Sequence, residues 1–531
     1  MLRYAPWFAI IVATVLTAAL ALGVDSGWWT GFAVVAPLAL LGVRDFLQPG
    51  HTLLRNYPVI AHFRWLFEAI RPEIRQYLLE SDTDAAPFSR RQRALAYQRA
   101  KSDNDKVPFG TQLDVYGDGH EWLNPSASAR QPDPDASPSV TVGNHQCHQP
   151  YDASILNISA MSFGALSAAA VRALNNGAAA GGFAHDTGEG GISRYHRESS
   201  ADLIWEIGSG YFGCRDEHGR FNPERFREQA ADPRVKMIEI KLSQGAKPGH
   251  GGVLPGVKVT REIADAREVP AGRDCISPAA HPEFSTPIGM MEFISRLREL
   301  SDGKPVGFKL CVGHPWEFMA LCKAMRETGI VPDYIVVDGS EGGTGAAPLE
   351  LADYIGTPMR EGLIFVHNAL TGCGLRDQIR IAAAGKVMSG FRMARNMALG
   401  ADWCNSARGF MFALGCIQSL HCHNDHCPTG ITTQDPWRQR GLDVTDKGER
   451  VRRFHSQTIA GLNGIVAACG LDSPIALRPH HVACRTRSHE IETLDHVYDF
   501  LEPGELLAET DNRTYREAWQ RARADSFHPV V

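Results

Sequence analysis

The segment Ile155-Leu-Asn-Ile-Ser-Ala-Met-Ser-Phe-Gly164 leads, after one alanine, into Leu166-Ser-Ala-Ala-Ala-Val-Arg-Ala-Leu-Asn-Asn-Gly-Ala-Ala-Ala-Gly-Gly182. Its first part is typical of a short apolar strand ending in a glycine-bearing loop, and its second part of an alanine-rich helix. The same order returns in MIEIKLSQGAKPGHGG, PVGFKLCVG, YIVVDGSEGGTG, IRIAAAGKVMSG and WCNSARGFMF. Over roughly 285 residues this order predicts an α/β fold, a (β/α)8 TIM barrel, whose usual size is about 250 residues. A doubly wound open sheet is the alternative, and the lack of a GxGxxG after an early strand weakens it.

Two uncharged, apolar runs precede this part of the chain, at residues 7–23 and 28–43, with a tight turn at Asp25 between them. Each run is slightly shorter than the ~20 residues of an ideal membrane span, and we expect a transmembrane helical hairpin over residues 1–45. Arg3 precedes the first run, and Arg44 and Arg55 follow the second. The positive-inside rule therefore predicts the cytoplasmic (inner) membrane, with the catalytic domain facing the cytoplasm. A signal peptide, or a single anchor with a peripheral second segment, is the alternative.

The rest of the chain divides by texture into three parts. Residues 46–149 are typical of a helical and irregular linker region, residues 150–485 hold the barrel pattern, and residues 486–531 are expected to form a C-terminal helical tail. The net charge of −6 argues against a nucleic-acid partner. Of the twelve cysteines nine are dispersed, which fits a reducing compartment better than a disulfide scaffold.

Three cysteines near the C-terminal end, Cys416, Cys422 and Cys427, are spaced C-x5-C-x4-C, and Pro428 follows the last. Three clustered thiolates suit an iron–sulfur cluster, because cysteine thiolates are its usual ligands and Cys-Pro recurs at cluster-binding turns. Zinc is the main rival, because nearby histidines could supply a fourth ligand. These histidines are His421, His423 and His426. Three ordinary buried cysteines are the remaining interpretation.

Glycine-rich loops follow three late predicted strands, at residues 338–345, 385–390 and 405–409. Backbone N–H groups in such loops and at helix starts favour anions, so the pattern predicts a phosphate-bearing cofactor at the barrel's usual phosphate site. Lys241 lies at a predicted strand end, and Gln244 and Lys247 follow it in a glycine-rich loop. Together they would bind a dicarboxylate or stabilise a reduced, anionic cofactor ring. Lys309 ends another apolar strand, and salt-bridged structural lysines are the alternative for all three.

Taken together and in order, six motifs resemble the synthase domain of glutamate synthases over residues 150–485. They are Ser159-Ala-Met-Ser-Phe-Gly-Ala165, Thr187-Gly-Glu-Gly-Gly191, Gln244-Gly-Ala-Lys-Pro-Gly249, Leu254-Pro-Gly-Val-Lys-Val259, Gly342-Gly-Thr-Gly-Ala346 and Cys416…Cys422…Cys427-Pro-Thr-Gly-Ile-Thr-Thr-Gln434. The chain most resembles the stand-alone FMN-binding glutamate synthase family proteins, some of which carry an N-terminal membrane segment.

The resemblance implies a TIM barrel that holds FMN beside a 3Fe-4S cluster, with Cys416, Cys422 and Cys427 as the cluster ligands. The residues implied near the flavin ring are Ala160, Met161, Ser162 and Lys309. Those implied near its phosphate are Ser340, Gly342, Gly343, Thr344, Gly385, Arg408 and Gly409. The residues implied for substrate and catalysis are Lys241, near the flavin ring, Gln244 and Lys247 at the 2-oxoglutarate carboxylates, Glu189 on the ammonia route, and Arg194, a further carboxylate ligand.

The implied activity is reductive amination of 2-oxoglutarate to glutamate, with electrons entering through the cluster. We expect neither a glutaminase domain nor the C-terminal β-helix domain in this chain, so ammonia would be free or come from a separate amidotransferase. The electron donor would be ferredoxin or a membrane carrier. Ser277-Pro-Ala-Ala-His281 replaces the family's usual SPPPHH-like motif, which leaves the substrate open. The alternatives are a membrane-linked amino-acid or amine dehydrogenase with the same cofactors, and a non-enzymatic redox sensor.

Overall fold

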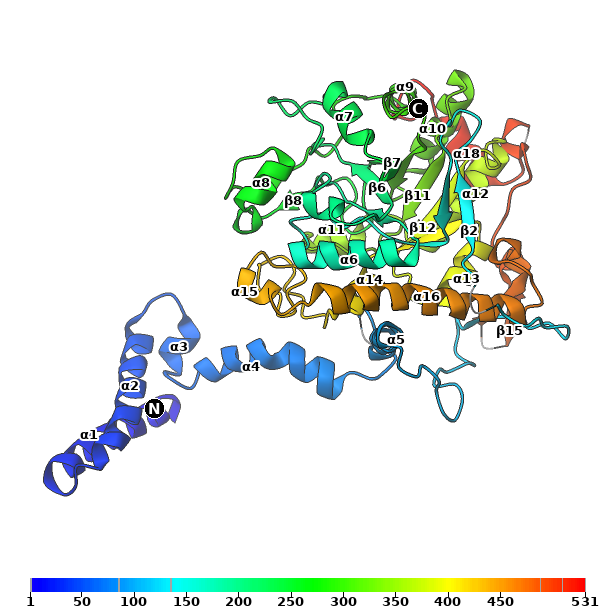
Figure 1. Ribbon diagram of the computed structural model, residues 1–531. Helices are drawn as coiled ribbons and strands as arrows, with labels where there is room; N and C mark the ends of the chain where they lie inside the picture. The colour runs from blue at the N-terminus through cyan, green and yellow to red at the C-terminus, as the bar shows by residue number, and fades with distance from the viewer. Residues whose placement is uncertain (1, 85, 134–135, 488, 509, 531) are drawn as a thin grey trace. The chain divides into compact units, whose positions relative to one another are not determined.

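The computed structural model describes residues 2–84, 86–133, 136–487, 489–508 and 510–530. The chain forms two compact units, Met1–Arg91 and Gln92–Val531. The larger unit contains a closed barrel, and the smaller one contains the apolar N-terminal helices (Figure 1).

Eight parallel strands close the barrel in chain order, and the last strand pairs with the first through Cys404 and Leu156. The strands are β4 (Leu156–Ile158), β5 (His185–Asp186), β6 (Leu203–Ile207), β7 (Val235–Lys241), β10 (Val306–Leu310), β11 (Tyr334–Asp338), β12 (Arg380–Ala384) and β13 (Trp403–Ser406). Almost every strand residue is buried, as expected for parallel strands covered by helices on one face and packed against each other inside the barrel. The predicted TIM barrel is therefore confirmed.

Helices surround the barrel, and their ends follow local sequence signals. The ring contains α6 (Ala168–Gly181), α7 (Pro223–Ala230), α9 (Pro287–Leu300), α10 (Pro315–Thr328), α12 (Met359–Gly372), α13 (Gly390–Ala398) and α16 (Val444–Ala468). Helix α6 begins where the Ser167 hydroxyl accepts the N–H of Ala170, and ends at Gly182, whose φ of 66° suits glycine. Helices α6 and α16 lie side by side (Figure 1). The remaining helices from residue 90 onward are α5 (Arg90–Lys101), α8 (Arg261–Arg267), α11 (Leu349–Tyr354), α14 (Arg408–Leu414), α15 (Pro436–Gln439), α17 (Leu494–Val497) and α18 (Arg513–Arg521).

Three small sheets flank the barrel. They are β1 (Glu121–Leu123) with β14 (Val482–Arg487) and β15 (Glu490–Thr493), β2 (Ser139–Val142) with β3 (Tyr151–Ser154), and β8 (Val253–Leu254) with β9 (Cys275–Ile276). Strands β1 and β2 come from the segment expected to be a linker, and β15 comes from the segment expected to be a helical tail. The domain limits drawn from the sequence stay predictions, but both segments contain strands as well as helices.

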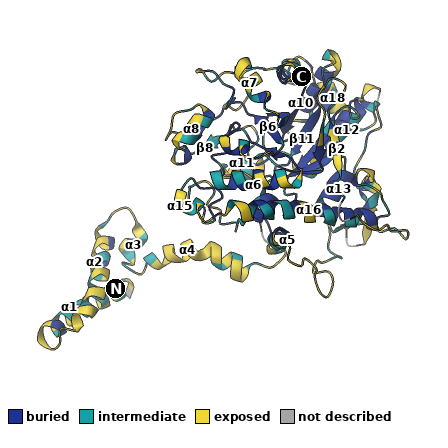
Figure 2. Cartoon of the chain, viewed as in Figure 1, coloured by how far each residue is buried: buried dark blue, intermediate teal, exposed yellow. Residues whose placement is uncertain are grey.

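The smaller unit contains two long apolar helices, α1 (Ala5–Gly23) and α2 (Trp28–Leu47), which pack against each other. The indole of Trp7 donates a hydrogen bond to the carbonyl of Ala39 and lies against Gly42, where a Cβ would collide with it. Both helices are long and apolar enough to cross a membrane by length and composition. Helices α3 (Thr52–Asn56) and α4 (His62–Ile74) and a π-helical turn (Arg75–Leu79) follow. Most of the residues of this unit are exposed (Figure 2).

Candidate functional site

Four predicted site residues lie at or just after the carboxyl ends of β5 and β7. The ammonium of Lys241 lies 3.1 Å from the carboxylate of Glu189, and their side chains are only 9% and 15% exposed. Burial alone would raise the pKa of Glu189, but Lys241 and Arg267 outweigh it and hold that pKa below its ordinary value. Lys247 is also buried, and burial together with Lys241 lowers the pKa of its ammonium. The Lys241–Glu189 pair and Lys247 thus form one charged set inside the C-terminal face.

Two glycines make room for this set. A Cβ at Gly252 would collide with the Glu189 carboxylate, and a Cβ at Gly208 would lie 2.8 Å from it. Gln244 donates a weak hydrogen bond of 3.4 Å to the hydroxyl of Thr344, which joins the loop after β7 to the loop after β11. The loops after β5, β6, β7 and β11 therefore meet at one place.

The loop after β4, which contains Ala160, Met161 and Ser162, packs against the loop after β5. A Cβ at Gly188 would lie 2.6 Å from the Ser162 nitrogen, so only glycine allows this approach. The guanidinium of Arg267, which the sequence did not indicate, donates to the Ser162 hydroxyl at 3.0 Å. Arg267 is 3% exposed, and it fixes this loop from the segment between β7 and β10.

Arg194 is the predicted site residue that the structure places elsewhere. Its side chain is 70% exposed and forms an ion pair of 2.7 Å with Glu262. The guanidinium also donates to the hydroxyl of Tyr195. This placement on the surface, with its charge already paired, favours a structural role over binding of a substrate carboxylate.

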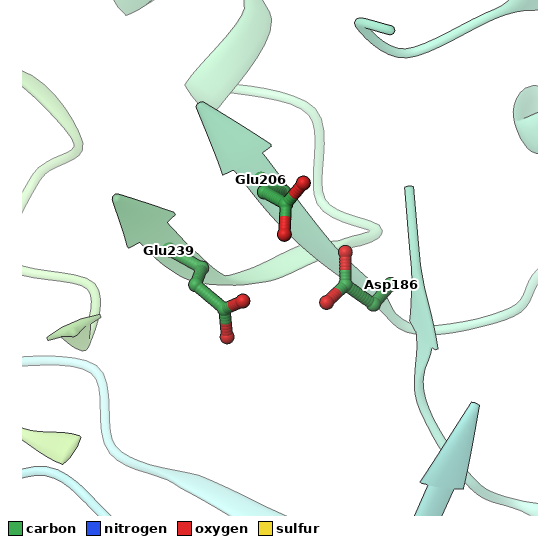
Figure 3. A group of neighbouring side chains, drawn as sticks. All are labelled: Asp186, Glu206 and Glu239. Atoms are coloured by element: carbon green, nitrogen blue, oxygen red, sulfur yellow. The ribbon is translucent and has the colours of Figure 1, made fainter. Parts of the chain in front are cut away.

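Inside the barrel, below this face, three carboxyl groups converge (Figure 3). Oxygens of Asp186, Glu206 and Glu239 lie within 4.8 Å of one another, and all three side chains are buried. The ammonium of Lys309 contacts Glu206 and lies 3.3 Å from Glu239. Burial raises the pKa of Asp186, and burial together with Asp186 and Asp338 raises the pKa of Glu239 well above its ordinary value. Among the described cations, Lys309 alone forms ion pairs with the group, and Lys241 also acts on Asp186 and Glu239. Two positive charges therefore face three carboxyl groups, and protonation of part of the group is favoured.

The loops after β11, β12 and β13 hold the residues predicted near a phosphate. A Cβ at Gly343 would lie 2.7 Å from the Arg408 guanidinium, and a Cβ at Gly385 would lie 3.6 Å from the Glu341 carboxylate. That carboxylate accepts the N–H of Met359, the first residue of α12. Arg408 and Lys386 lie close enough to interact with the same charge. An anionic group therefore already lies in this cradle, at a helix N-terminus among cations, which is the environment that suits a phosphate.

The other predicted phosphate residues lie on the same loops. The N–H of Ser340 donates to the carbonyl of Thr357, and the N–H of Gly342 donates to the carbonyl of Gly339. Gly409 packs against Ser406 so closely that a Cβ would not fit. The loops are thus held by their own backbone, and their glycines leave space for close approach of a ligand.

The three clustered cysteines follow β13 and α14, in the loop that leads toward α16. Burial raises the pKa of the Cys416 thiol to about 12, with the thiols of Cys422 and Cys427 adding to the effect, so the three sulfurs are neighbours. Burial also favours the neutral thiol of Cys427, but hydrogen bonds from Thr429 and Thr432 outweigh it and lower the pKa. This loop therefore brings together three thiols, of which Cys427 is buried and Cys416 and Cys422 are half-buried.

The spacing of these sulfurs bears on the two metal interpretations. Four ligands on one tetrahedral zinc ion lie about 3.8 Å apart, given Zn–S distances near 2.3 Å. Among the described residues, Asp186, Glu206 and Glu239 form the only group of three or more His, Cys, Asp or Glu ligand atoms within 4.8 Å of one another. The cysteine sulfurs and the neighbouring histidine nitrogens of the described loop do not form such a group. Three thiols in one loop are the ligand type of an iron–sulfur cluster, and zinc stays the alternative.

His281, from the altered motif, is buried beside the charged set. Its Nε2 donates to the carbonyl of Lys241 at 2.9 Å, and its Nδ1 accepts from the hydroxyl of Tyr211 at 3.1 Å. Burial lowers the pKa of His281 to about 4, so it is neutral at physiological pH, as this pattern of one donor and one acceptor requires. His281 therefore positions the end of β7 and with it Lys241.

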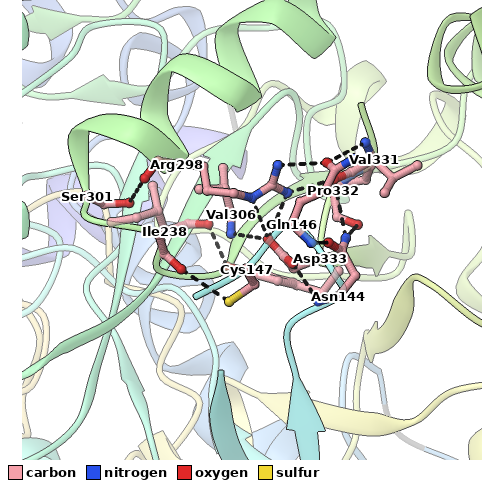
Figure 4. A network of polar contacts seen from close by, with 12 residues as sticks. Asn144, Gln146, Cys147, Ile238, Arg298, Ser301, Val306, Val331, Pro332 and Asp333 are labelled. Atoms are coloured by element: carbon pink, nitrogen blue, oxygen red, sulfur yellow. Dashed lines mark hydrogen bonds and ion pairs between the residues drawn. The ribbon is translucent and has the colours of Figure 1, made fainter. Parts of the chain in front are cut away.

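The opposite end of the barrel is closed by a polar network without such unpaired charge (Figure 4). The carboxylate of Asp333, just before β11, forms a 2.9 Å ion pair with Arg298 and accepts the N–H groups of Asn144 and Val306, both at 2.8 Å. Arg298 also donates to Gln146. These contacts connect the segment between β2 and β3 to the amino-terminal end of the barrel. The network of Asp333 and Arg298 therefore has a structural role.

Comparison with known proteins gives consistent matches. A sequence profile described as "Conserved region in glutamate synthase" matches residues 122–472. "Glutamate synthase large subunit-like protein YerD" of Bacillus subtilis is 37% identical over 506 residues, which cover 87% of this chain and 96% of that protein. An "Archaeal-type glutamate synthase (NADPH)" of Thermotoga neapolitana is 32% identical over 335 residues, 63% of each chain. The chain thus spans slightly less than two thirds of the second relative's length.

Among solved structures, a mutant flavocytochrome b2 with pyruvate bound is 13% identical, with a TM-score of 0.41, and the match covers 84% of this chain and 98% of that one. Similarity at this level of identity and TM-score does not indicate a shared function. The barrel follows from the strand pairing alone.

Proposed function

Because the chain belongs to the glutamate synthase family of oxidoreductases, we propose that it reductively aminates 2-oxoglutarate to glutamate. The observation that carries the proposal is the charged set of Lys241, Glu189 and Lys247 at the carboxyl-end face of the barrel. Buried cations at this face suit a dianionic substrate, since barrel active sites lie at the carboxyl ends of the strands.

FMN is the proposed cofactor. The fit rests on the cradle around Glu341, where Arg408, Lys386 and the first turn of α12 favour an anion. The loop of Ala160, Met161 and Ser162, with Lys309, would hold the ring. The residues that would hold the phosphate are Ser340, Gly342, Gly343, Thr344, Gly385, Arg408 and Gly409. When bound, FMN supplies two-electron transfer that protein side chains cannot perform.

A 3Fe-4S cluster on Cys416, Cys422 and Cys427 is the proposed electron entry. Three neighbouring thiols in one loop, of which Cys427 is buried and the other two are half-buried, support it. Ferredoxin or a membrane carrier would deliver the electrons. Reduction of 2-oxoglutarate and ammonium to glutamate and water consumes two electrons and two protons.

In this proposal, the side chains bind and orient the substrate. Lys247 and Gln244 hold its carboxylates, and Lys241 places a positive charge beside the reacting carbon. Glu189 keeps Lys241 in position through their ion pair, and lies where ammonia would arrive. The ammonia would be free or supplied by a separate amidotransferase.

We also propose that α1 and α2 form a hairpin in the cytoplasmic membrane, with the barrel in the cytoplasm. Their length and composition support it. The basic residues around them, Arg3, Arg44 and Arg55, favour this orientation.

The test is an anaerobic mixing experiment on detergent-purified full-length protein whose flavin has been reduced beforehand. With 2-oxoglutarate and 15N-ammonium, we expect rapid reoxidation of the flavin and one 15N-glutamate per flavin. Absence of bound flavin, or reduced flavin that stays reduced with both substrates present, would overturn the proposal.

A second candidate is an amino-acid or amine dehydrogenase that passes electrons to the membrane, which the two apolar helices favour. The oxidised protein distinguishes the two. Reduction of its flavin by an amino acid or amine in the presence of a quinone acceptor, without reoxidation by 2-oxoglutarate and ammonium, would favour the dehydrogenase.

A further inference from the structure

Lys258 belongs to the motif Leu254-Pro-Gly-Val-Lys-Val259, which has no role in the proposed reaction. It ends a short 3-10 helix (Gly256–Lys258) and is only 2% exposed. Its ammonium donates to the carbonyl of Ala165 at 2.9 Å and to the carbonyl of Cys422 at 3.3 Å. One side chain therefore joins the end of the loop after β4 to the cysteine loop.

The charge of Lys258 lacks an ordinary partner. Within the described part of the chain it forms no ion pair with a carboxylate, and both of its hydrogen-bond acceptors are neutral carbonyls. The groups near enough to act on its charge are the Asp425 carboxylate and the sulfurs of Cys422 and Cys427, all on the cysteine loop. A buried ammonium is costly unless an opposite charge compensates it, so its position indicates negative charge on the cysteine loop.

We propose that Lys258 is the positioning and charge-compensating residue of an iron–sulfur cluster held by the three cysteines. The inference rests on the proposed function, which supplies the cluster. Thiolates and sulfides make such a cluster anionic, and reduction adds further negative charge. A fixed positive charge beside it stabilises the reduced form and raises the reduction potential. Because the same ammonium holds the Ala165 carbonyl, it also fixes the distance between the cysteine loop and the flavin-facing loop.

The experiment compares full-length wild-type protein with K258M, which removes the charge and keeps the chain length, and K258R, which keeps the charge. Lys304 offers a matched control, because it is buried and donates to the carbonyls of Ala230 and Asp232 on strand-connecting segments at the other end of the barrel. Iron, sulfide and flavin contents are measured first, and EPR-monitored titration then gives the reduction potential of the cluster.

We expect K258M to keep its flavin and to shift the one-electron reduction equilibrium at least tenfold toward the oxidised cluster, about 59 mV. K258R and K304M should match the wild type. A complete cluster with an unchanged potential in K258M, or an equal shift in K304M, would overturn the assignment. Cluster loss in K258M with retention in K258R would support it, and loss in both would show a steric requirement instead. Wild-type protein with flavin but no iron or sulfide would remove the cluster itself, which is a failure of the proposed function.

An independent surface lies on α4 and the π-helical turn that follows it. Apolar side chains recur there at helical spacing, on one face. They are Phe63, Leu66, Phe67, Ile70, Ile74, Tyr77 and Leu78. No residue of α4 is buried, and Phe67 is 60% exposed. An apolar stripe of this length is rarely left in water by a folded protein.

We infer that this stripe lies on an anionic lipid bilayer. The inference rests on the proposed membrane hairpin: α4 follows two helices that are apolar and long enough to span a membrane, so it would lie at the bilayer surface. Arg64 and Arg71 lie along one flank of the stripe, where their charges would meet lipid headgroups. The apolar face would then enter the acyl boundary while Glu68 stays in water.

The experiment places a photoreactive benzoyl-phenylalanine at Phe67 or, as the control, at Glu68, in full-length protein reconstituted with phosphatidylglycerol-containing or purely phosphatidylcholine bilayers. An interfacial helix predicts at least about fivefold more lipid adduct at position 67 than at 68, with more adduct in the anionic bilayer. Equal adducts at both positions would overturn the inference. A protein crosslink at position 67, to this chain or to a second copy, would do the same.

Discussion

The buried carboxyl group of Glu239 allows the electrostatics of the barrel interior to be tested through protein stability, without any bound cofactor. Neither of its oxygens accepts a hydrogen bond within the described residues, and the ammonium of Lys309, 3.3 Å away, makes closer contact with Glu206. Burial, Asp186 and Asp338 raise the pKa of Glu239 well above its ordinary value. Glu239→Gln replaces a protonated carboxyl by a neutral group of the same shape.

The sign of the effect follows from proton linkage. Above the unfolded-state pKa, the unfolded chain loses the Glu239 proton while the folded protein keeps it, so wild-type stability falls as pH rises until the folded pKa is passed. The glutamine variant avoids this loss. Its stability should equal that of the wild type near pH 4 and exceed it by up to about 1.4 kcal/mol more for each further pH unit. For a unit of this size that corresponds to about 1.5 °C in Tm per pH unit.

The assay is thermal unfolding of both proteins in detergent at pH 5, 6, 7 and 8, followed by intrinsic fluorescence. Glu206→Gln is the matched control, because removing the carboxylate that touches Lys309 leaves a buried ammonium poorly compensated. That variant should lose stability at every pH in this range. A Glu239→Gln variant less stable than the wild type at pH 8 would refute the reasoning, since it would mean that Glu239 is ionised and paired with Lys309.

Three further predictions concern single contacts. Lys247→Met should weaken 2-oxoglutarate binding about 10- to 100-fold, as loss of a charge-assisted hydrogen bond does, whereas Arg194→Met should leave it unchanged; flavin difference titration measures both. Gly252→Ala should displace the Glu189 carboxylate and cost about 1–3 kcal/mol, seen as a lower Tm with bound flavin retained, and an unchanged Tm would contradict the close packing. Asp333→Asn should cost about 3–5 kcal/mol, because it leaves a buried guanidinium unpaired, and a loss below about 1 kcal/mol in urea unfolding would show that the network is not tightly formed.

The sequence predicts the barrel well because most of its strands are compact apolar runs followed by a glycine-bearing loop, although β5 (His185–Asp186) has no such run. It predicts the cysteine loop because the three thiols lie within twelve residues and their spacing is unlike that of scattered cysteines. Lys241 is also predictable, since it ends an apolar strand, whereas Glu189 was indicated only by the resemblance to glutamate synthases. Each of these features depends on residues that are close in the sequence, so it can be recognised before the fold is known.

The cluster of three carboxyl groups inside the barrel (Asp186, Glu206 and Glu239) was not predicted. Its members come from three different strands, which only barrel closure brings together. One signal existed: Glu206 and Glu239 each stand between apolar residues of a strand, in LIWEI and in the MIEI part of VKMIEIK, where a charged residue is rarely buried without a partner. Arg267 and Lys258 come from the long segment between β7 and β10, about a hundred residues or more from the atoms that they contact. Arg194 illustrates the opposite case: its role stays a prediction, but its side chain is exposed and paired with Glu262, because proximity to a motif in sequence does not fix where a side chain points.

The distribution of partners among the buried lysines connects these observations. At the carboxyl-end face, Lys241 and Lys309 have carboxylate partners, whereas Lys247 and Lys258 form no ion pair within the described residues. The two lysines without a carboxylate partner lie where an anionic substrate and an anionic cluster are proposed. Each ligand would therefore supply the charge that the polypeptide leaves out, and binding of either should stabilise the folded protein. A barrel whose cations were all paired with its own carboxylates would gain no such electrostatic benefit from a ligand. We therefore expect 2-oxoglutarate alone to stabilise the apoprotein against unfolding, and we expect Lys247→Met to abolish this stabilisation. That result would indicate that the positive charges are arranged to bind anionic ligands.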